Sequence, residues 1–273
     1  MKVIVSHDVD HLSYSEHAAD LFIPKFAVRS AIECGLRHIS VSEFVRRGMR
    51  IWSNRFHNLG ELMEFDRAEG ITSTFFFAVA NGKGLTYRPA EARPWIRRAM
   101  EGGFDVGVHG IAFEDEQEVR REHDAFRDLS GLGQFGIRMH YLRRSDTTLG
   151  LLAGAGYSFD STYYGLQNPY RVGRMWEFPL QIMDVDIIRK NASWQNICLD
   201  EATEDTKKMI GEACDRGITH LSVNFHDRFF CREFETWMEW YGWLIRYLKD
   251  CGHEFTSYQD AMAEIEGGTP CRV

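Results

Sequence analysis

Two aspartates stand two residues apart near the N-terminus, in the segment HDVD at residues 7–10. The preceding residues, KVIVS, form an apolar run that predicts a β-strand. Because side chains in a strand alternate between its faces, Asp8 and Asp10 point to the same side, about 7 Å apart along the backbone. Two carboxylates on one face repel each other unless water, a cation or a shared proton relieves the repulsion. The pair is therefore a candidate for metal binding or acid–base chemistry.

Polar side chains also stand where later apolar runs end: His109, Arg138, His140, Asp160, His226 and Asp227. A single strand-end aspartate or histidine is more often a helix cap or a satisfied polar residue. In a parallel barrel, however, the carboxyl ends of the strands form the active-site rim. Five strands that deliver Asp, His and Arg to one rim would supply what a hydrolytic metal site requires. Arg138 and His140 share one face of their strand, so Arg138 could hold a carboxylate ionised.

The elements that must position these residues alternate short apolar runs with amphipathic stretches. This alternation is typical of βα units around a parallel sheet or barrel, and it predicts a single α/β domain over residues 1–273. The expected strands are 2–8, 72–79, 104–109, 135–142, 157–161, 177–183, 219–226 and 253–258. The expected helices lie near 24–51, 58–69, 89–101, 114–130, 146–155, 203–216 and 232–250. Between them, residues 163–200 are the least regular and predict a loop-rich region.

Composition narrows the class of protein. The net charge of -8 comes without a basic stripe, which argues against a nucleic-acid partner. We expect neither a signal peptide nor a membrane span, because the chain opens on a strand and no stretch approaches about 18 apolar residues. The cysteines form no CxxC pair, which predicts reduced thiols in a cytoplasmic protein; they are residues 34, 198, 214, 231, 251 and 271.

Five short motifs, HDVD, GVHG, IRMHYL, FDST and VNFH, follow one another over residues 1 to about 230. In this order and spacing the sequence resembles the polysaccharide deacetylases (NodB homology, carbohydrate esterase family 4). It is most similar to the branch with HDVD and RxH motifs that is associated with O-antigen and lipopolysaccharide biosynthesis. The resemblance implies a distorted (β/α)7 TIM-like barrel and the metal-dependent removal of an N-acetyl group from an amino sugar.

The resemblance also implies roles for individual residues. Asp10 and His109 would bind a divalent metal. The remaining roles are Asp8 as general base, Arg138 orienting Asp8, His226 protonating the leaving amine, and Asp160 orienting His226 and raising its pKa. These residue types suit the reaction, since an amide resists attack by water and its amine leaves only with a proton.

The sequence departs from the family at one ligand position. The family motif has a second histidine four residues after the first, where this chain has Phe113. His140, at a place where the family usually has proline, is the preferred third ligand, with His11, Glu114 and Asp115 as alternatives. One Asp and two His suit zinc, the expected ion, or cobalt or nickel, whereas a site with fewer protein ligands would suit manganese. A metal-free homologue that serves as a sugar-binding module is an alternative function, as is a hydrolase of another N-acyl group such as formyl.

The expected partner is an N-acetylated amino sugar, either free or linked to a nucleotide or a lipid. Arg171 and Arg174 could contact the phosphate of such a carrier. Aromatic side chains in the irregular region could stack on a sugar ring; they are Tyr163, Tyr164, Tyr170 and Trp176. The apolar stripe of residues 234–248 predicts a core face or a dimer face, which leaves a homodimer open.

Overall fold

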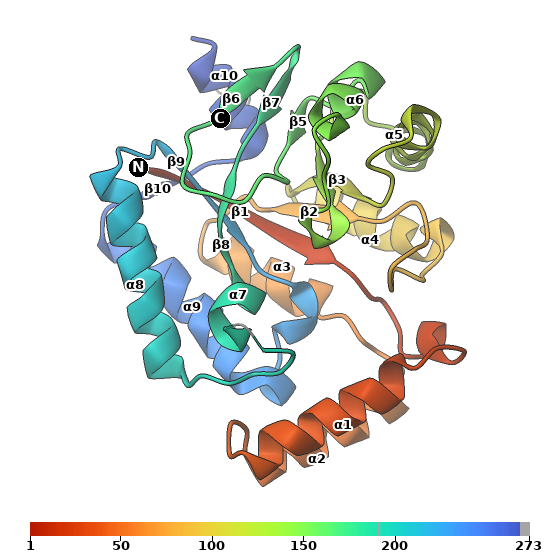
Figure 1. Cartoon of the computed structure of the whole chain (residues 1–273), viewed down its shortest axis with the longest axis vertical. Helices are drawn as coiled ribbons and strands as arrows, with labels where there is room; N and C mark the ends of the chain where they lie inside the picture. The colour runs from red at the N-terminus through yellow and green to blue at the C-terminus, as the bar shows by residue number, and fades with distance from the viewer. Residues whose placement is uncertain (191, 268–273) are drawn as a thin grey trace.

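The computed structural model describes residues 1–190 and 192–267, which form one α/β domain around a curled sheet (Figure 1). The strands are β1 (Lys2–Val9), β2 (Thr74–Phe77), β3 (Asp105–Gly110), β4 (Ile137–Met139), β5 (Phe159–Asp160), β6 (Tyr170–Val172), β7 (Met175–Glu177), β8 (Leu180–Met183), β9 (His220–Asn224) and β10 (Glu254–Phe255). Their order in the sheet is β6-β7-β5-β4-β3-β2-β1-β9-β8, with β10 beside the start of β1.

The two sides of the sheet meet through the chain that follows β5. Tyr164 bridges Leu180 of β8 in parallel, and the Leu180 amide donates to the carbonyl of Tyr163 over 2.7 Å. In the described chain, seven parallel strands, β1 to β5, β8 and β9, thus run round one interior. The predicted distorted (β/α)7 barrel is confirmed.

Helices cover the outside of the barrel (Figure 1). They are α1 (Phe22–Gly35), α2 (Val41–Trp52), α3 (Leu59–Ala68), α4 (Pro89–Glu101), α5 (Glu116–Ser130), α6 (Thr148–Ala155), α7 (Asp184–Arg189), α8 (Leu199–Asp215), α9 (Glu235–Asp250) and α10 (Tyr258–Ile265). Single 3-10 turns lie at Ser15–His17 (η1), His140–Leu142 (η2), Asp227–Phe229 (η3) and Arg232–Phe234 (η4). The pair α1 and α2 projects beyond the other helices at the foot of Figure 1.

Strand β1 shows how the sheet sorts its side chains. Ser6 and Asp8 face the barrel interior, where both accept hydrogen bonds from Arg138. His7 points the opposite way and pairs with Asp66 of α3 at 2.9 Å. The alternation predicted for Asp8 and Asp10 is therefore present, and the histidine between Ser6 and Asp8 belongs to the packing of α3 against the sheet.

The structure differs from the expected elements at several places. The strand expected over 135–142 ends at Met139, and His140–Leu142 form η2. The single helix expected near 24–51 is two helices, because the chain turns after Gly35, with Arg37 at a φ of 62°, and Ser40 then caps α2 by accepting from the Glu43 amide. The irregular region contains the β6–β7 hairpin and α7 in addition to β8, which lies within the expected strand 177–183. Finally, α10 follows β10.

The apolar stripe of α9 is core. Trp237, Trp240 and Tyr241 are buried, and the Trp240 indole donates to Thr206 of α8. This face of α9 is therefore no dimer surface.

In the part of the chain that the structure describes, no helix is long and apolar enough to cross a bilayer. The cysteines of that part are free thiols, as expected, at residues 34, 198, 214, 231 and 251, whereas Cys271 lies outside the described residues.

Substitutions of two glycines test how tightly the barrel is packed. A Cβ on Gly107 in β3 would lie 2.8 Å from the Gly136 carbonyl oxygen and from the Phe76 ring. Gly107→Ala should therefore lower the free energy of unfolding by about 1–3 kcal/mol. Gly211→Ala, at an exposed position of α8 with open space, should raise it by about 0.5–1 kcal/mol. Urea denaturation measures both, and equal effects of the two substitutions would contradict the packing described for β3.

Candidate active site

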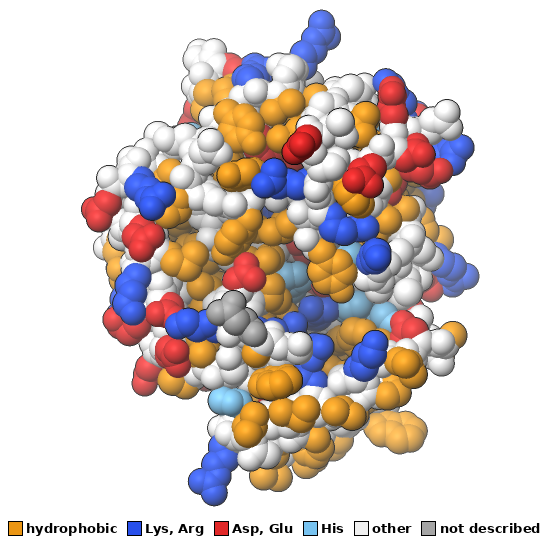
Figure 2. All heavy atoms as spheres, viewed as in Figure 1, with side chains coloured by type: hydrophobic (Ala, Val, Ile, Leu, Met, Phe, Trp, Pro, Cys, Tyr) orange, Lys and Arg blue, Asp and Glu red, His pale blue; other side chains and the backbone are white. Residues whose placement is uncertain are grey.

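The carboxyl ends of β1, β3, β4 and β9 open into a cavity of about 850 Å³. Figure 2 shows this hollow at the centre of the molecule, with histidine and cationic side chains visible inside it. Its lining includes five of the residues predicted from the sequence, Asp8, Asp10, His109, His140 and His226. These five side chains, predicted from their positions at strand ends, therefore lie in one cavity.

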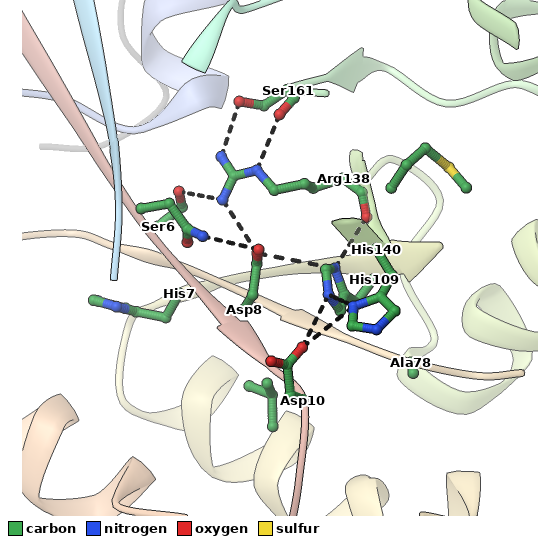
Figure 3. Close-up of polar contacts among 12 residues, drawn as sticks. Ser6, His7, Asp8, Asp10, Ala78, His109, Arg138, His140 and Ser161 are labelled. Carbon is green, nitrogen blue, oxygen red and sulfur yellow. Dashed lines mark hydrogen bonds and ion pairs between the residues drawn. The ribbon is translucent and has the colours of Figure 1, made fainter. Parts of the chain in front are cut away.

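Asp10, His109 and His140 converge on one point (Figure 3). The Asp10 Oδ1 atom lies 3.3 Å from His109 Nε2 and 3.4 Å from His140 Nδ1. The two imidazole nitrogens are 3.0 Å apart. All three residues are buried. Bonds of about 2.0–2.2 Å to a tetrahedral ion place its ligand atoms about 3.3–3.5 Å apart, so the spacing fits a metal such as zinc.

The other nitrogen of each ring determines which form the two histidines adopt. His109 Nδ1 faces the Arg138 carbonyl at 3.1 Å, and His140 Nε2 faces the Lys83 carbonyl at 3.2 Å. A carbonyl only accepts, so in each neutral ring that nitrogen carries the hydrogen and the nitrogen toward Asp10 presents a lone pair. Asp10 Oδ1 is buried without a hydrogen-bond partner. Three lone-pair donors thus face one another, which favours a bound cation.

Asp10 is ionised despite its burial. Burial raises the pKa of this carboxyl, but the charge of the Arg228 guanidinium opposes burial, and the pKa lies well below its usual range. The Arg228 Nη1 atom lies 3.2 Å from Asp10 Oδ2. Asp10 can therefore offer Oδ1 to a metal while Oδ2 is held by Arg228.

Asp8 is fixed from both sides. Arg138 donates to Oδ1 over 3.2 Å, and Asn224 donates to Oδ2 over 2.9 Å. Burial raises the pKa of Asp8, but the charges of His109 and Arg138 lower it more, so this carboxylate is also ionised. The contact between Arg138 and Asp8 is the one expected from the sequence. It places an oriented, deprotonated carboxylate beside the three converging side chains.

His226 is oriented by a residue that sequence reasoning missed. Asp184 Oδ1 lies 2.7 Å from His226 Nδ1, and Asp184 Oδ2 accepts from the His226 amide. Burial disfavours the imidazolium, but the Asp184 carboxylate overcomes this and raises the pKa of His226 to about 9. His226 is thus protonated and can donate from Nε2, which points toward Asp10 at 3.8 Å.

The prediction that Asp160 orients His226 is therefore wrong. Strand β8 neighbours β9 in the sheet, whereas β5 does not, so the carboxylate that follows β8 is the one that reaches His226. Asp160 instead accepts from the Thr162 hydroxyl over 2.6 Å and lies outside the cavity lining. Burial raises the pKa of Asp160, and burial with the nearby Asp160 charge raises the pKa of Glu177.

Of the three alternative ligands, Glu114 and Asp115 lie away from the cavity, whereas His11 lines it. Phe113 packs on the core, with the Arg143 guanidinium 5.1 Å from the centre of its ring. Asp115 caps α5 by accepting from the Gln117 and Glu118 amides. Glu114 is exposed and does not line the cavity. His140 therefore has the position expected of the substitute ligand.

A second histidine group adjoins the cavity. His11 Nδ1 and His17 Nε2 are 2.9 Å apart, with Glu16 Oε1 within 3.6 Å of both. His17 also pairs with Asp20 at 2.9 Å, and His11 stacks on Phe56. One ring can donate to the other, and Glu16 Oε1 accepts from the Leu12 amide, whereas Glu16 Oε2 is buried without a hydrogen-bond partner.

The residues predicted to contact a carrier lie away from the cavity. Arg171 pairs with Glu266 and covers Trp176 on the β6–β7 hairpin. Arg174 is exposed and does not line the cavity. Of the four aromatic residues proposed for sugar stacking, Tyr164 lines the cavity.

Two missed site residues follow the same signal as those that were found. Asp184 comes directly after an apolar run, as Asp10 does, and Asn224 precedes His226 by two residues on the same strand face. A third, Arg228, lies in η3 beyond β9 and has no such signal.

No family model and no curated protein matches the sequence. Solved structures do match the fold. A Mycobacterium smegmatis protein assigned to the polysaccharide deacetylases superposes with a TM-score of 0.64 at 16% identity, covering 100% of this chain and 93% of that one. The Puue allantoinase superposes with a TM-score of 0.60 at 15% identity, covering 94% of this chain and 86% of that one. A Bacillus anthracis pseudoenzyme of family CE4 superposes with a TM-score of 0.51 at 10% identity, covering 94% of this chain and 63% of that one. The chain therefore has the fold of the polysaccharide deacetylases, as its motifs predicted.

Proposed function

We propose that this protein is a metal-dependent amide hydrolase that removes the N-acetyl group of an amino sugar. The observation that carries the proposal is the convergence of Asp10, His109 and His140, whose potential ligand atoms lie 3.0–3.4 Å from one another in a buried site. Zinc is the ion that these ligands favour, with cobalt or nickel next. A divalent ion held there would acidify water and polarise the acyl carbonyl.

The acid–base work falls to residues on either side of that point. Asp8, ionised and held by Arg138 and Asn224, would take a proton from the attacking water. His226, kept protonated by Asp184, would give its proton to the departing nitrogen. An amine is a poor leaving group without that proton, so this pairing suits an amide substrate.

A role in cytoplasmic assembly of surface polysaccharide, O-antigen or lipopolysaccharide is part of the proposal and is supported by the motif resemblance alone. A hydrolase of another N-acyl group, such as formyl, would use the same residues, because nothing in the acid–base machinery selects the acyl chain.

The second candidate function is a metal-free sugar-binding module, and a pseudoenzyme of the same fold exists. The replacement of the family's second histidine by Phe113 favours this function. The geometry favours an enzyme, because a binding module needs neither a base with its own arginine nor an acid with its own carboxylate.

Metal content tests the ligand set. The purified protein should hold near one equivalent of zinc or cobalt after dialysis, and His109→Ala and His140→Ala should each weaken binding by at least about 100-fold. His17→Ala is the matched control from the neighbouring histidine group and should bind as the parent does. Elemental analysis and cobalt(II) absorption spectra measure both. Loss of the metal in His17→Ala, with retention in His140→Ala, would contradict the assignment.

Two substrates separate the base from the acid. The leaving group of 4-nitrophenyl acetate departs without a proton. The amine of an N-acetylated amino sugar must be protonated before it leaves. Asp8→Asn should lower kcat on both by about 10²–10⁴ while the metal stays bound. His226→Gln should lower kcat on the amide by about 10²–10³ and on the ester by less than about tenfold. If Asp8→Asn left acetate release from both substrates unchanged, the proposed mechanism would be abandoned.

A further inference from the structure

Three arginines from separate segments meet on one wall of the cavity. Arg29 comes from α1, Arg189 ends α7 and Arg228 lies in η3, and all three line the cavity. Arg228 is bound to Asp10. Among the described residues, no carboxylate lies within ion-pair distance of Arg29 or Arg189, and the buried Nε atoms of Arg189 and Arg228 have no hydrogen-bond partner.

This arrangement differs from that of a neighbouring buried arginine. Arg47, close by, is paired with both Glu33 and Glu43. The carboxylates nearest to the three arginines are already engaged, because Glu33 also accepts from the Gln195 amide and Asp184 is bound to His226. The guanidinium of Arg189 is instead held flat against the rings of Phe229 and Trp237.

The like charges act on one another. Burial, followed by the charges of Arg228 and Arg29, lowers the pKa of Arg189 to about 9. Burial and Arg228 also lower the pKa of Arg29. The protein has a net charge of -8, yet among the described residues no carboxylate forms an ion pair with Arg29 or Arg189. The unsatisfied donors point to a ligand that brings the negative charge itself.

We propose that Arg29, Arg189 and Arg228 form a subsite for a phosphate or diphosphate group on the sugar substrate. Planar guanidinium forks match phosphate oxygens and bind them in pairs, and several arginines suit a group with two or more negative charges. This inference rests on the proposed function for the sugar part of the ligand, and it narrows the substrate to a phosphate-linked amino sugar. It also moves the carrier contact from Arg171 and Arg174, where the sequence suggested it, into the cavity.

Binding of pyrophosphate tests the subsite without any turnover. Isothermal titration calorimetry of the metal-loaded protein should show pyrophosphate binding that Arg29→Met and Arg189→Met each weaken about tenfold. Arg174→Met, an exposed arginine outside the cavity, is the matched control and should change nothing. Arg29 is half-buried on a helix surface, so its replacement should leave the fold intact. Equal pyrophosphate affinity in the parent and both cavity variants would overturn the subsite, and tighter binding of glucuronate than of pyrophosphate would overturn the choice of phosphate.

Kinetics separate this inference from the proposed function. With N-acetylglucosamine 1-phosphate, Arg29→Met should raise KM about tenfold, while KM for the neutral methyl glycoside should stay the same. If acetate were released from both sugars with the same KM in the parent and in the variant, the hydrolase proposal would stand and the subsite would be overturned. Pyrophosphate binding that depends on both arginines, with no acetate released from any sugar, would sustain the subsite and overturn the hydrolase.

A second, independent observation concerns the helical hairpin of α1 and α2. Its outward face is apolar, and the side chains recur about every four residues along each helix (Figure 2, foot of the view). The exposed apolar residues of this face are Val28 and Ile32 on α1, Leu36 directly after α1, and Val41, Phe44, Val45, Met49 and Trp52 on α2. Trp52 is 91% exposed. The charged residues Glu33, Glu43 and Arg47 point inward instead, which reverses the usual polarity of a surface helix.

Charge decides between the partners that such a face could meet. Residues 22–52 contain six Lys or Arg and two Glu, but Arg47 pairs with both Glu residues, and Arg46 and Arg50 pair with carboxylates outside the segment. The exposed charged residues of this segment are Lys25 and Arg37, both cationic, one near each end of α1. Two copies related by a two-fold axis would bring like charges together. An apolar face with cations at its edges is instead complementary to an anionic bilayer.

We infer that the α1–α2 hairpin docks on the surface of an anionic lipid bilayer. Because Arg29 of α1 lines the cavity, docking would bring the proposed phosphate subsite close to the lipid headgroups. A lipid carrier of the sugar phosphate would then be favoured over a nucleotide.

Vesicle sedimentation tests the docking. The protein should bind vesicles of phosphatidylcholine with phosphatidylglycerol, bind pure phosphatidylcholine vesicles several-fold more weakly, and lose affinity with salt. Met49→Gln combined with Trp52→Gln should weaken binding at least about tenfold, whereas Ile265→Gln, an exposed apolar residue of α10, should not. The inference fails if the protein ignores anionic vesicles, or if light scattering shows a dimer that the double substitution dissociates.

Discussion

The buried ion pair between Arg138 and Asp8 is the contact on which both the barrel and the site depend. Arg138 is fully buried, and its guanidinium donates to Ser6, Asp8, Ser161 and the Tyr258 hydroxyl, so one side chain joins β1, β4, the end of β5 and α10 (Figure 3). Removing one partner of such a pair leaves an uncompensated charge and costs about 3–5 kcal/mol. Asp8 is consequently ionised and fixed by the same contact that holds the strands together.

The charged residues near this pair are offset by neighbours of opposite charge. Asp10 carries a negative charge between His109, His140 and Arg228, and His226 carries a positive charge beside Asp184. A cation at the three converging ligands would complete this arrangement. The cavity wall with Arg29 and Arg189 carries positive charge that forms no ion pair with a described carboxylate.

Sequence reasoning predicted what depends on local periodicity. Strand alternation correctly placed Asp8 inside the barrel, and the carboxyl-end rule brought His109, His140 and His226 to one cavity. It failed where neighbours in the sheet matter, because the order β1-β9-β8 cannot be read from apolar runs, and the partner of His226 was assigned to β5 instead of the segment after β8. The three arginines were also beyond its reach, since their segments are distant in sequence and two of them lie in no regular pattern.

Zinc K-edge X-ray absorption of the protein loaded with one equivalent of zinc would test the central claim most directly. The account predicts two imidazole ligands and carboxylate or water oxygens, with bonds of about 2.0–2.2 Å. It also predicts the loss of one imidazole in His140→Ala. A spectrum with sulfur neighbours at about 2.3 Å, or one that His140→Ala leaves unchanged, would contradict it.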